Sequence, residues 1–340
     1  MSITKVASHA GVSKSTVSLV INDSPLVLPS TADKVRLSMQ AIGYVPSPRE
    51  LRRGRKPNGS LKNRSLNIAL VTLGIPAAVL RAPLYCDVLH GIGNAIREHR
   101  HRFTVFNAPN AREFSAEEIL SSGADGFLLF GRGEPTESSH AFREFPCVAL
   151  MGVDAPRKWC DWVGYDDAVV GQLAAAHALR RGHLNCAYFG LPEWRRGQMF
   201  GEMIRAAGGQ VTMFDSAGLI VSRDDIHEVE NVAMDALVEK LLSTTPRPTA
   251  VFVWADMLTA ALYPRLQVRG IQPGKDISII SCNKEWPLLF GLQPQPAVVD
   301  VQGVKIGYRS VQQLLWRMHN RKESRVVMLL EPVLIPDQQP

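Results

Sequence analysis

Residues 3–22 constrain the fold more than any other stretch, because two helical patterns flank a single glycine there. Apolar side chains recur at helical spacing within residues 3–10, which predicts a short helix with one apolar face. Gly11 ends that helix, since glycine enters a left-handed turn without steric cost. Ser13 has the side chain of an N-cap, and apolar residues recur again over 14–21. This arrangement predicts a helix-turn-helix, a motif whose second helix enters a DNA major groove.

The charge distribution favours a nucleic-acid partner for the N-terminal end alone. Residues 1–65 hold 11 Lys or Arg and 3 Asp or Glu, whereas the rest of the chain carries a net charge of −2. A basic segment of this kind attracts a polyanion. The second helix also begins Ser-Lys-Ser-Thr, which provides short polar and cationic groups for phosphates and base edges. The alternative for this stretch alone is a helical hairpin packed in an ordinary core.

After residue 65, short apolar strands alternate with amphipathic helices. The sequence predicts strands at 66–72, 102–107, 125–130, 147–150, 186–189, 250–253 and 277–280, and helices at 85–98, 113–121, 169–181 and 196–207. This alternation predicts an α/β fold with parallel sheets that are covered on both faces. Residues 46–65 contain three Pro, two Gly and a run of cations, a composition typical of a linker that buries no core.

The overall composition predicts a cytoplasmic globular protein. Hydrophobic residues make up 46% of the 340 residues, yet no run of 18 apolar residues is present, so no membrane span is expected. The first residues lack a basic stretch followed by an apolar segment, and a secretory signal is therefore not expected. The five cysteines have no CxxC spacing, which predicts small core residues rather than a disulfide framework.

The sequence carries no complete catalytic or metal-binding motif, so neither an enzyme nor a cofactor is predicted. Gly91-Ile92-Gly93 lies in a predicted helix and lacks the third glycine of a dinucleotide-binding loop. Asp166 and Asp167 follow a strand, where the ligand site of an α/β protein is expected. Adjacent carboxylates there are able to act in catalysis, to accept hydrogen bonds from a ligand, or to cap the helix that begins near Val169.

Two further sets of residues follow a pattern known from one protein family. The N-terminal set is Val6-Ala7, Ala10-Gly11-Val12-Ser13, Ser15-Thr16-Val17-Ser18 and Asn22, followed by Val35, Gly43-Tyr44 and Pro46. The later set includes residues 67–71, 124–130, 182–183, 187–190, 270–271 and 273–280. Together they resemble the LacI/GalR family of bacterial transcription regulators over nearly the whole chain. The resemblance implies a third helix from Thr31 to Ile42 and two Rossmann-like lobes, as in periplasmic sugar-binding proteins, with crossovers near 160, 290 and 320.

The resemblance implies three parts, namely a helix-turn-helix DNA-binding domain over 1–45, a basic hinge or linker over 46–65, and a two-lobed effector-binding and dimerisation domain over 66–340. It implies a transcription regulator, expected to be a repressor, that binds a pseudo-palindromic operator in double-stranded DNA as a homodimer. A small-molecule effector such as a sugar or a nucleoside is expected to gate it. Helix 85–98 is a candidate element of the dimer interface. The alternative is a cytoplasmic two-lobed solute-binding module or enzyme whose helical head binds protein.

The recognition helix departs from the family at one position that matters for base readout. Lys14 and Ser15 stand at its exposed start and are the predicted base readers. Leu19 stands where the family commonly has Arg, so this residue is able to contact a thymine methyl group but not to pair with guanine. The remaining candidates, for phosphate contacts or helix caps, are Ser13, Thr16, Ser18 and Asn22.

The linker differs from the family pattern more than the recognition helix does. In the family a hinge helix folds on DNA and a Leu enters the minor groove, but this chain has Arg53 at that position and Leu51 nearby. Residues 53–57, Arg-Gly-Arg-Lys-Pro, resemble an AT-hook, an extended segment that lies in narrow A·T minor grooves. The sequence leaves open whether Leu51, Arg53 and Arg55 belong to a hinge helix, to a minor-groove arm or to a flexible linker that contacts only phosphates.

The residues that contact effectors in the family are also altered. Gln198 stands where the family often has Arg, and Ala255-Asp256 stands in place of Asn-Asp. Residues 281–284, Ser-Cys-Asn-Lys, replace a Gly-aromatic-Asp-Asp motif. An aromatic face such as that of Trp254 suits sugars and bases, with plain core packing as the alternative. The predicted effector contacts are Tyr85, Asp166, Arg196, Gln198, Trp254, Asp256 and Asn283.

Overall fold

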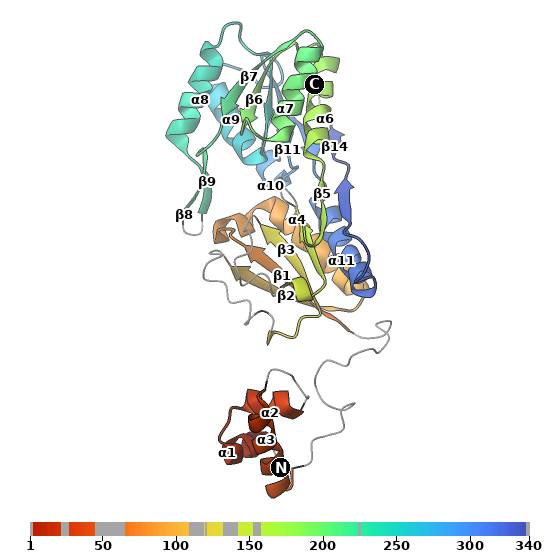
Figure 1. Cartoon of the computed structure of the whole chain (residues 1–340). Helices are drawn as coiled ribbons and strands as arrows, with labels where there is room; N and C mark the ends of the chain where they lie inside the picture. The colour runs from red at the N-terminus through yellow and green to blue at the C-terminus, as the bar shows by residue number, and fades with distance from the viewer. Residues whose placement is uncertain are drawn as a thin grey trace. The chain divides into compact units, whose positions relative to one another are not determined.

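The computed structural model describes residues 3–21, 27–44, 65–108, 119, 121–131, 142–151, 158–223 and 226–337. Contacts divide the chain into two units, Met1–Arg64 and Ser65–Pro340. Figure 1 shows the helical first unit in red and the α/β second unit in orange to blue.

Within its described residues, the first unit contains three helices: α1 (Ile3–Ala10), α2 (Lys14–Ile21) and α3 (Pro29–Ala41). Gly11 joins α1 to α2 with a φ of 61°, so the left-handed turn predicted at this glycine is confirmed. Pro29 begins α3, because its fixed φ and missing N–H suit the first turn of a helix. A small apolar core closes the bundle and contains Val6, Ala7, Ala10, Val17, Val20, Val35 and Met39.

The second unit consists of two lobes, each built on a six-stranded sheet. The first sheet has the order β13-β5-β4-β3-β1-β2 and is parallel throughout. Its strands are β1 (Asn67–Leu73), β2 (Arg102–Ala108), β3 (Gly126–Gly131), β4 (Cys147–Leu150), β5 (Asp161–Tyr165) and β13 (Val327–Leu330). The helices described in this lobe include the 3₁₀ helix η2 (Ala77–Arg81), α4 (Pro83–Glu98) and α11 (Gly303–His319). Strand β1 is buried from Ile68 to Leu73, which explains its continuous apolar sequence.

The second sheet has the order β14-β12-β11-β10-β6-β7, with only the β12–β14 pair antiparallel. Its strands are β6 (Asn185–Gly190), β7 (Gln210–Asp215), β10 (Ala250–Val253), β11 (Ser278–Cys282), β12 (Ala297–Asp300) and β14 (Val333–Ile335). The helices described here are α6 (Asp167–Arg180), α7 (Arg195–Ala206), α8 (Asn231–Ser243), α9 (Asp256–Val268) and α10 (Trp286–Leu289). A hairpin of β8 (Ile220–Arg223) and β9 (Ile226–Val229) extends from this lobe and contacts η2 of the first lobe.

The described chain crosses between the lobes after β5, after β12 and after β13, at residues 166, 301–302 and 331–332. The predicted crossovers near 160, 290 and 320 are therefore each too early. The reason is that β5, β12 and β13 are short, and nothing in their sequences marks them as the last strand before a crossing. The predicted fold of two α/β lobes with a helical head is confirmed.

Helices α4 and α11 approach each other closely through two glycines. A Cβ atom at Gly91 of α4 would lie 1.9 Å from the carbonyl oxygen of Val304, and one at Gly307 of α11 would lie 2.0 Å from that of Val88. Both contacts involve backbone, which cannot move aside as a flexible side chain does. Cys86 is exposed on α4, so the prediction that all cysteines are core residues is wrong for this one, although the other four are buried.

We expect Gly307→Ala to lower the free energy of unfolding by about 1–3 kcal/mol, because the added methyl group overpacks the α4–α11 contact. Urea unfolding of the full chain measures the change. The matched control is Gly93→Ala in α4, where an added Cβ meets no atom within 4 Å. That variant should be more stable than the wild type by about 0.5–1 kcal/mol, through helix propensity alone. Equal stability of the two variants would contradict the close helix approach.

Candidate DNA-binding surface and interlobe site

Helix α2 has a polar first turn that faces solvent. The backbone N–H of Thr16 donates to Ser13 Oγ at 3.1 Å, so Ser13 is an N-cap, one of the two roles predicted for it. The hydroxyl oxygens of Ser15 and Thr16 lie 2.9 and 2.8 Å from the same Oγ. Lys14 and Ser15 are exposed and have the space to reach a groove.

The apolar side of α2 is turned inward, where Val17 and Val20 join the core. Leu19 is 37% exposed and lies four residues after Ser15, so the two share a helix face. Ser18 is half-buried. The predicted DNA-binding residues Asn22, Leu51, Arg53 and Arg55 lie outside the described residues.

In the second unit, segments that follow strands of both sheets meet between the lobes. Figure 1 shows α10 and the start of α4 in this region. We call the polar residues gathered there the interlobe cluster, which comprises Tyr165, Asp167, Arg196, Trp254, Asp256, Ser281, Cys282, Asn283 and Glu285. The cluster brings together four of the seven predicted effector contacts.

Arg196 is the centre of one half of the cluster and is 1% exposed. Its Nε donates to Asp167 Oδ1 at 2.6 Å, and its Nη2 donates to the Tyr165 hydroxyl at 2.7 Å. Its Nη1 donates to the Trp254 carbonyl oxygen at 3.1 Å and to Cys282 Sγ at 3.2 Å. The sequence predicts Arg196 as an effector contact from its position near Gln198. In the structure its guanidinium donates hydrogen bonds to protein groups, and Asp167 neutralises its charge.

Asp256 is the centre of the other half and is completely buried. The Ser281 hydroxyl donates to Oδ1, and the backbone N–H of Glu285 donates to Oδ2 at 2.5 Å. Burial raises the pKa of Asp256 from its usual 3.8 to about 8, although these two hydrogen bonds lower it. Burial therefore favours the protonated form of Asp256, and both its oxygens have internal partners.

Glu285 connects the two lobes directly. Its Oε1 accepts a hydrogen bond at 3.2 Å from the backbone N–H of Leu84, in the first turn of α4. The first N–H groups of a helix have no partner within the helix, so this carboxylate caps α4 from the opposite lobe. Its Oε2 accepts from Asn283 Nδ2 at 3.4 Å. Burial raises the pKa of Glu285, opposed by its hydrogen bond from Leu84.

Tyr85 and Trp254 have buried donors without an internal acceptor. The Tyr85 hydroxyl and the Trp254 indole nitrogen make no hydrogen bond with the described residues. Tyr85 is in the first turn of α4 and packs on Phe130 with ring centroids 5.2 Å apart. Burial raises the pKa of Tyr85 to about 12, so the hydroxyl keeps its proton. Trp254 follows β10 and meets Trp194 edge-on at 4.6 Å.

The three remaining predicted effector contacts are Asp166, Gln198 and Asn283. Asp166 caps α6, accepting from the backbone N–H groups of Ala168 and Val169 at 2.9 and 3.4 Å, which is one of the roles predicted for it. Gln198 is exposed on α7, and its amide donates to the Glu193 carbonyl oxygen at 3.2 Å. Asn283 is half-buried with a φ of 106°, an unusual conformation for a residue with a side chain.

The sequence does not predict Tyr165 or Glu285 as site residues. The position of Asp167 beside Asp166, directly after a strand, indicates a polar site. The sequence alone does not show which of the two carboxylates caps the helix. No local sequence pattern indicates the role of Glu285, because its partner Leu84 is 201 residues away in the chain. Within the described residues, no group of three or more His, Cys, Asp or Glu is placed to hold a metal ion.

Two family models match the chain. The model for bacterial regulatory proteins of the lacI family matches residues 2–47, and the model for the periplasmic binding protein-like domain matches residues 175–336. The chain belongs to the LacI family. As a LacI-family protein with an exposed recognition helix, it is a DNA-binding transcription regulator. None of the described helices is long and apolar enough to cross a membrane.

Similar LacI-family proteins include the HTH-type transcriptional repressor PurR of Pasteurella multocida, 25% identical over 98% of this chain and 96% of that protein. The HTH-type transcriptional regulator GntR of Pseudomonas aeruginosa is 29% identical over 92% of this chain and 88% of its own length. Among solved structures, a complex of the transcriptional regulator CelR with cellobiose has a TM-score of 0.66 at 22% identity and covers all of both chains. This likeness confirms the fold.

The raised pKa of Asp256 gives the fold a specific pH dependence. Its pKa is raised in the folded state, so the native protein holds a proton that the unfolded chain releases between pH 4 and 8. The stabilisation from this proton is present below the unfolded pKa and is lost as the pH rises towards about 8.

We expect Asp256→Asn to remove this part of the pH dependence and to keep the fold. An Asn oxygen accepts from the N–H of Glu285, and its NH₂ group donates to Ser281, whose hydroxyl lies 2.7 Å from that of Thr259. Urea unfolding across this pH range should show a smaller loss of stability with rising pH in the variant. Parallel pH profiles of variant and wild type would show that Asp256 is ionised in the folded protein.

Proposed function

We propose that this LacI-family regulator acts as a repressor that binds a pseudo-palindromic operator as a homodimer, with α2 in the major groove. The observation that carries this is the exposed polar first turn of α2, held by the Ser13 cap on a separate helical unit. A single head reads too few base pairs for a unique site, so two related by a twofold axis are required. Lys14 and Ser15 read bases in this proposal, and Leu19 contacts a thymine methyl group.

A small neutral ligand is proposed to gate the protein at the interlobe cluster. The support is the pair of buried donors on Tyr85 and Trp254, since an unpaired buried donor lowers stability and an acceptor oxygen would satisfy it. The charged groups nearby already have internal partners, as Arg196 has Asp167 and Lys284 has Asp300 at 2.7 Å. An uncharged hydroxyl- or carbonyl-bearing molecule, such as a sugar or a nucleoside, fits these donors better than an ion.

The similar proteins are consistent with this ligand class. CelR is bound to cellobiose in its solved structure, and a LacI-family regulator of Enterococcus faecium is bound to ribose. In the present chain we assign direct contacts to Tyr85, Trp254, Asn283 and Gln198. We assign positioning roles to Arg196 and Asp256, which hold the segments that carry those residues, and a helix-capping role to Asp166.

Lys14→Ala should change the sequence preference of DNA binding and weaken the preferred operator by about 1–3 kcal/mol, because a base contact is lost. Selection from a pool of randomised palindromes, followed by gel shifts, measures both effects. Lys5→Ala, an exposed lysine of α1, is the control and should leave the preference unchanged. If Lys14→Ala weakens all sequences equally, Lys14 contacts only phosphates.

A thermal-shift screen with ribose, glucose, cellobiose, adenosine and guanosine tests the effector proposal. At least one compound should raise the melting temperature, since a ligand at 100 times its Kd stabilises the native state by about 2.7 kcal/mol. The same compound should change operator affinity in a gel shift, because it favours one arrangement of the lobes.

Asn283→Ala should reduce that shift, whereas Gln267→Ala, on an exposed position of α9, should not. If none of the compounds changes either the melting temperature or operator affinity, gating by these ligands is wrong. The DNA-binding proposal is tested separately by Lys14→Ala and does not depend on this result.

A further inference from the structure

The first lobe contains a cavity of about 220 Å³ that the proposed function does not use. It lies at the amino ends of β4 and β5, where Cys147 and Asp161 begin these strands, and beside the end of α11. The strands of this sheet are parallel, so the cavity is at the opposite end of the lobe from the interlobe cluster, which follows carboxyl ends of strands. Four arginines contribute to its lining, and we call it the arginine cavity: Arg143, Arg317, Arg321 and Arg325.

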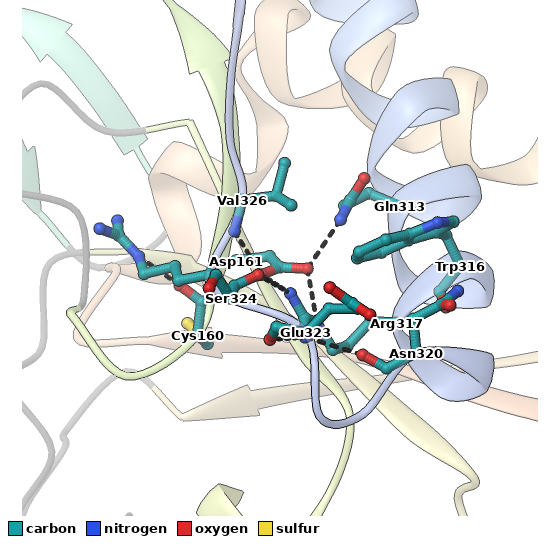
Figure 2. Close-up of polar contacts among 10 residues, drawn as sticks. Cys160, Asp161, Gln313, Trp316, Arg317, Asn320, Glu323, Ser324 and Val326 are labelled. Atoms are coloured by element: carbon teal, nitrogen blue, oxygen red, sulfur yellow. Dashed lines mark hydrogen bonds and ion pairs between the residues drawn. The ribbon is translucent and has the colours of Figure 1, made fainter.

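Arg317 is fixed in the wall of the cavity. Its Nη2 and Nε donate to the two carboxylate oxygens of Asp161 at 2.7 and 2.9 Å, as Figure 2 shows. Its remaining N–H groups donate to the backbone oxygens of Asn320, Glu323 and Ser324. Arg317 therefore has no donor left for a ligand, and its charge is neutralised by Asp161.

The other three arginines keep donors for a ligand. The Nε of Arg325 donates a hydrogen bond to the Cys160 carbonyl oxygen at 2.7 Å. The two terminal nitrogens of Arg325 have no partner among the described residues. Arg321 makes no hydrogen bond or ion pair with those residues either. Glu144 and Glu323 also line the cavity, so the lining keeps one net positive charge once the Asp161–Arg317 pair is set aside. This balance favours a monoanion over a highly charged ligand.

One wall of the cavity is aromatic. Trp159 contributes its indole ring, and the guanidinium of Arg143 lies over that ring at 5.9 Å from its centroid. The volume of about 220 Å³ equals that of about seven water molecules. A single inorganic ion would leave most of this space to water, whereas a six-membered ring with one carboxylate would fill much of it.

We propose that the arginine cavity binds a small aromatic carboxylate, separately from the interlobe site. The carboxylate accepts hydrogen bonds from Arg321 and Arg325, since a guanidinium and a carboxylate match in a planar, two-point contact. The ring lies against Trp159. The elements around the cavity include β5, α11 and the start of β13, each of which adjoins a crossover between the lobes. The cavity lies at the ends of these elements that are farther from the crossovers.

Isothermal titration of the full chain with benzoate tests this proposal. Benzamide has the same shape without the charge, and acetate has the charge without the ring. We expect one benzoate per chain and binding at least about tenfold weaker for both of the other probes, because each lacks one of the two contacts. Arg321→Gln and Arg325→Gln should each weaken benzoate binding by at least about tenfold.

Lys322→Gln is the matched control, since it removes the same charge from the neighbouring residue, which does not line the cavity. It should leave benzoate binding within about twofold. Asn283→Ala, at the interlobe cluster, should also leave it unchanged. The proposal is overturned if benzoate shows no saturable binding, if benzamide binds equally well, or if Lys322→Gln weakens binding as much as the two arginine variants.

Discussion

A single buried carboxylate, Asp161, holds together three segments of the first lobe, namely the start of β5, the end of α11 and the chain just before β13. Its oxygens accept from Arg317 of α11, from Gln313 one turn earlier at 2.7 Å, and from the backbone N–H of Val326, just before β13, at 2.9 Å. Asp161 itself begins β5. Removing one member of such a pair leaves an uncompensated buried charge, which destabilises a protein strongly. The five donors of Arg317 all have acceptors, so the pair meets the geometric condition under which a buried ion pair is tolerated.

The head and the central strands could be predicted from sequence because their signals are local. Gly11 and Ser13 define the turn and the cap within three residues, and β1 is apolar on both faces because both are covered. Strand β13 is a short apolar run, Val-Met-Leu-Leu, and the sequence does not assign it to the first sheet because its partner β5 lies far earlier in the chain. The predicted crossover near 320 is therefore placed before β13, whereas the chain crosses after this strand.

The polar site was predicted in part, for a physical reason. The positions after strands are predictable from the fold, and four predicted residues do meet in the interlobe cluster. The partner of each side chain is not predictable, because it depends on contacts distant in sequence. Arg196 bonds Asp167, 29 residues away, and Cys282, 86 residues away. Where the family has acidic residues, this chain has Asn283 and Lys284, and Lys284 forms an ion pair with Asp300. The altered residues thus stabilise the protein itself, and an effector must bind among groups that already have partners.

The three crossovers make each lobe discontinuous in the chain. The first lobe takes its sheet from residues 65–165 and then again from 327–330, and it takes α11 from the last forty residues. During synthesis the helical head is complete early, whereas the first lobe waits for α11 and β13 while the second lobe is made. Until then, the glycine face of α4 and the carboxylate of Asp161 have no partner. The first lobe is therefore completed only when β13 is made, just before β14 completes the second lobe, and a nascent chain stalled before residue 303 exposes an apolar helix face suited to capture by a chaperone.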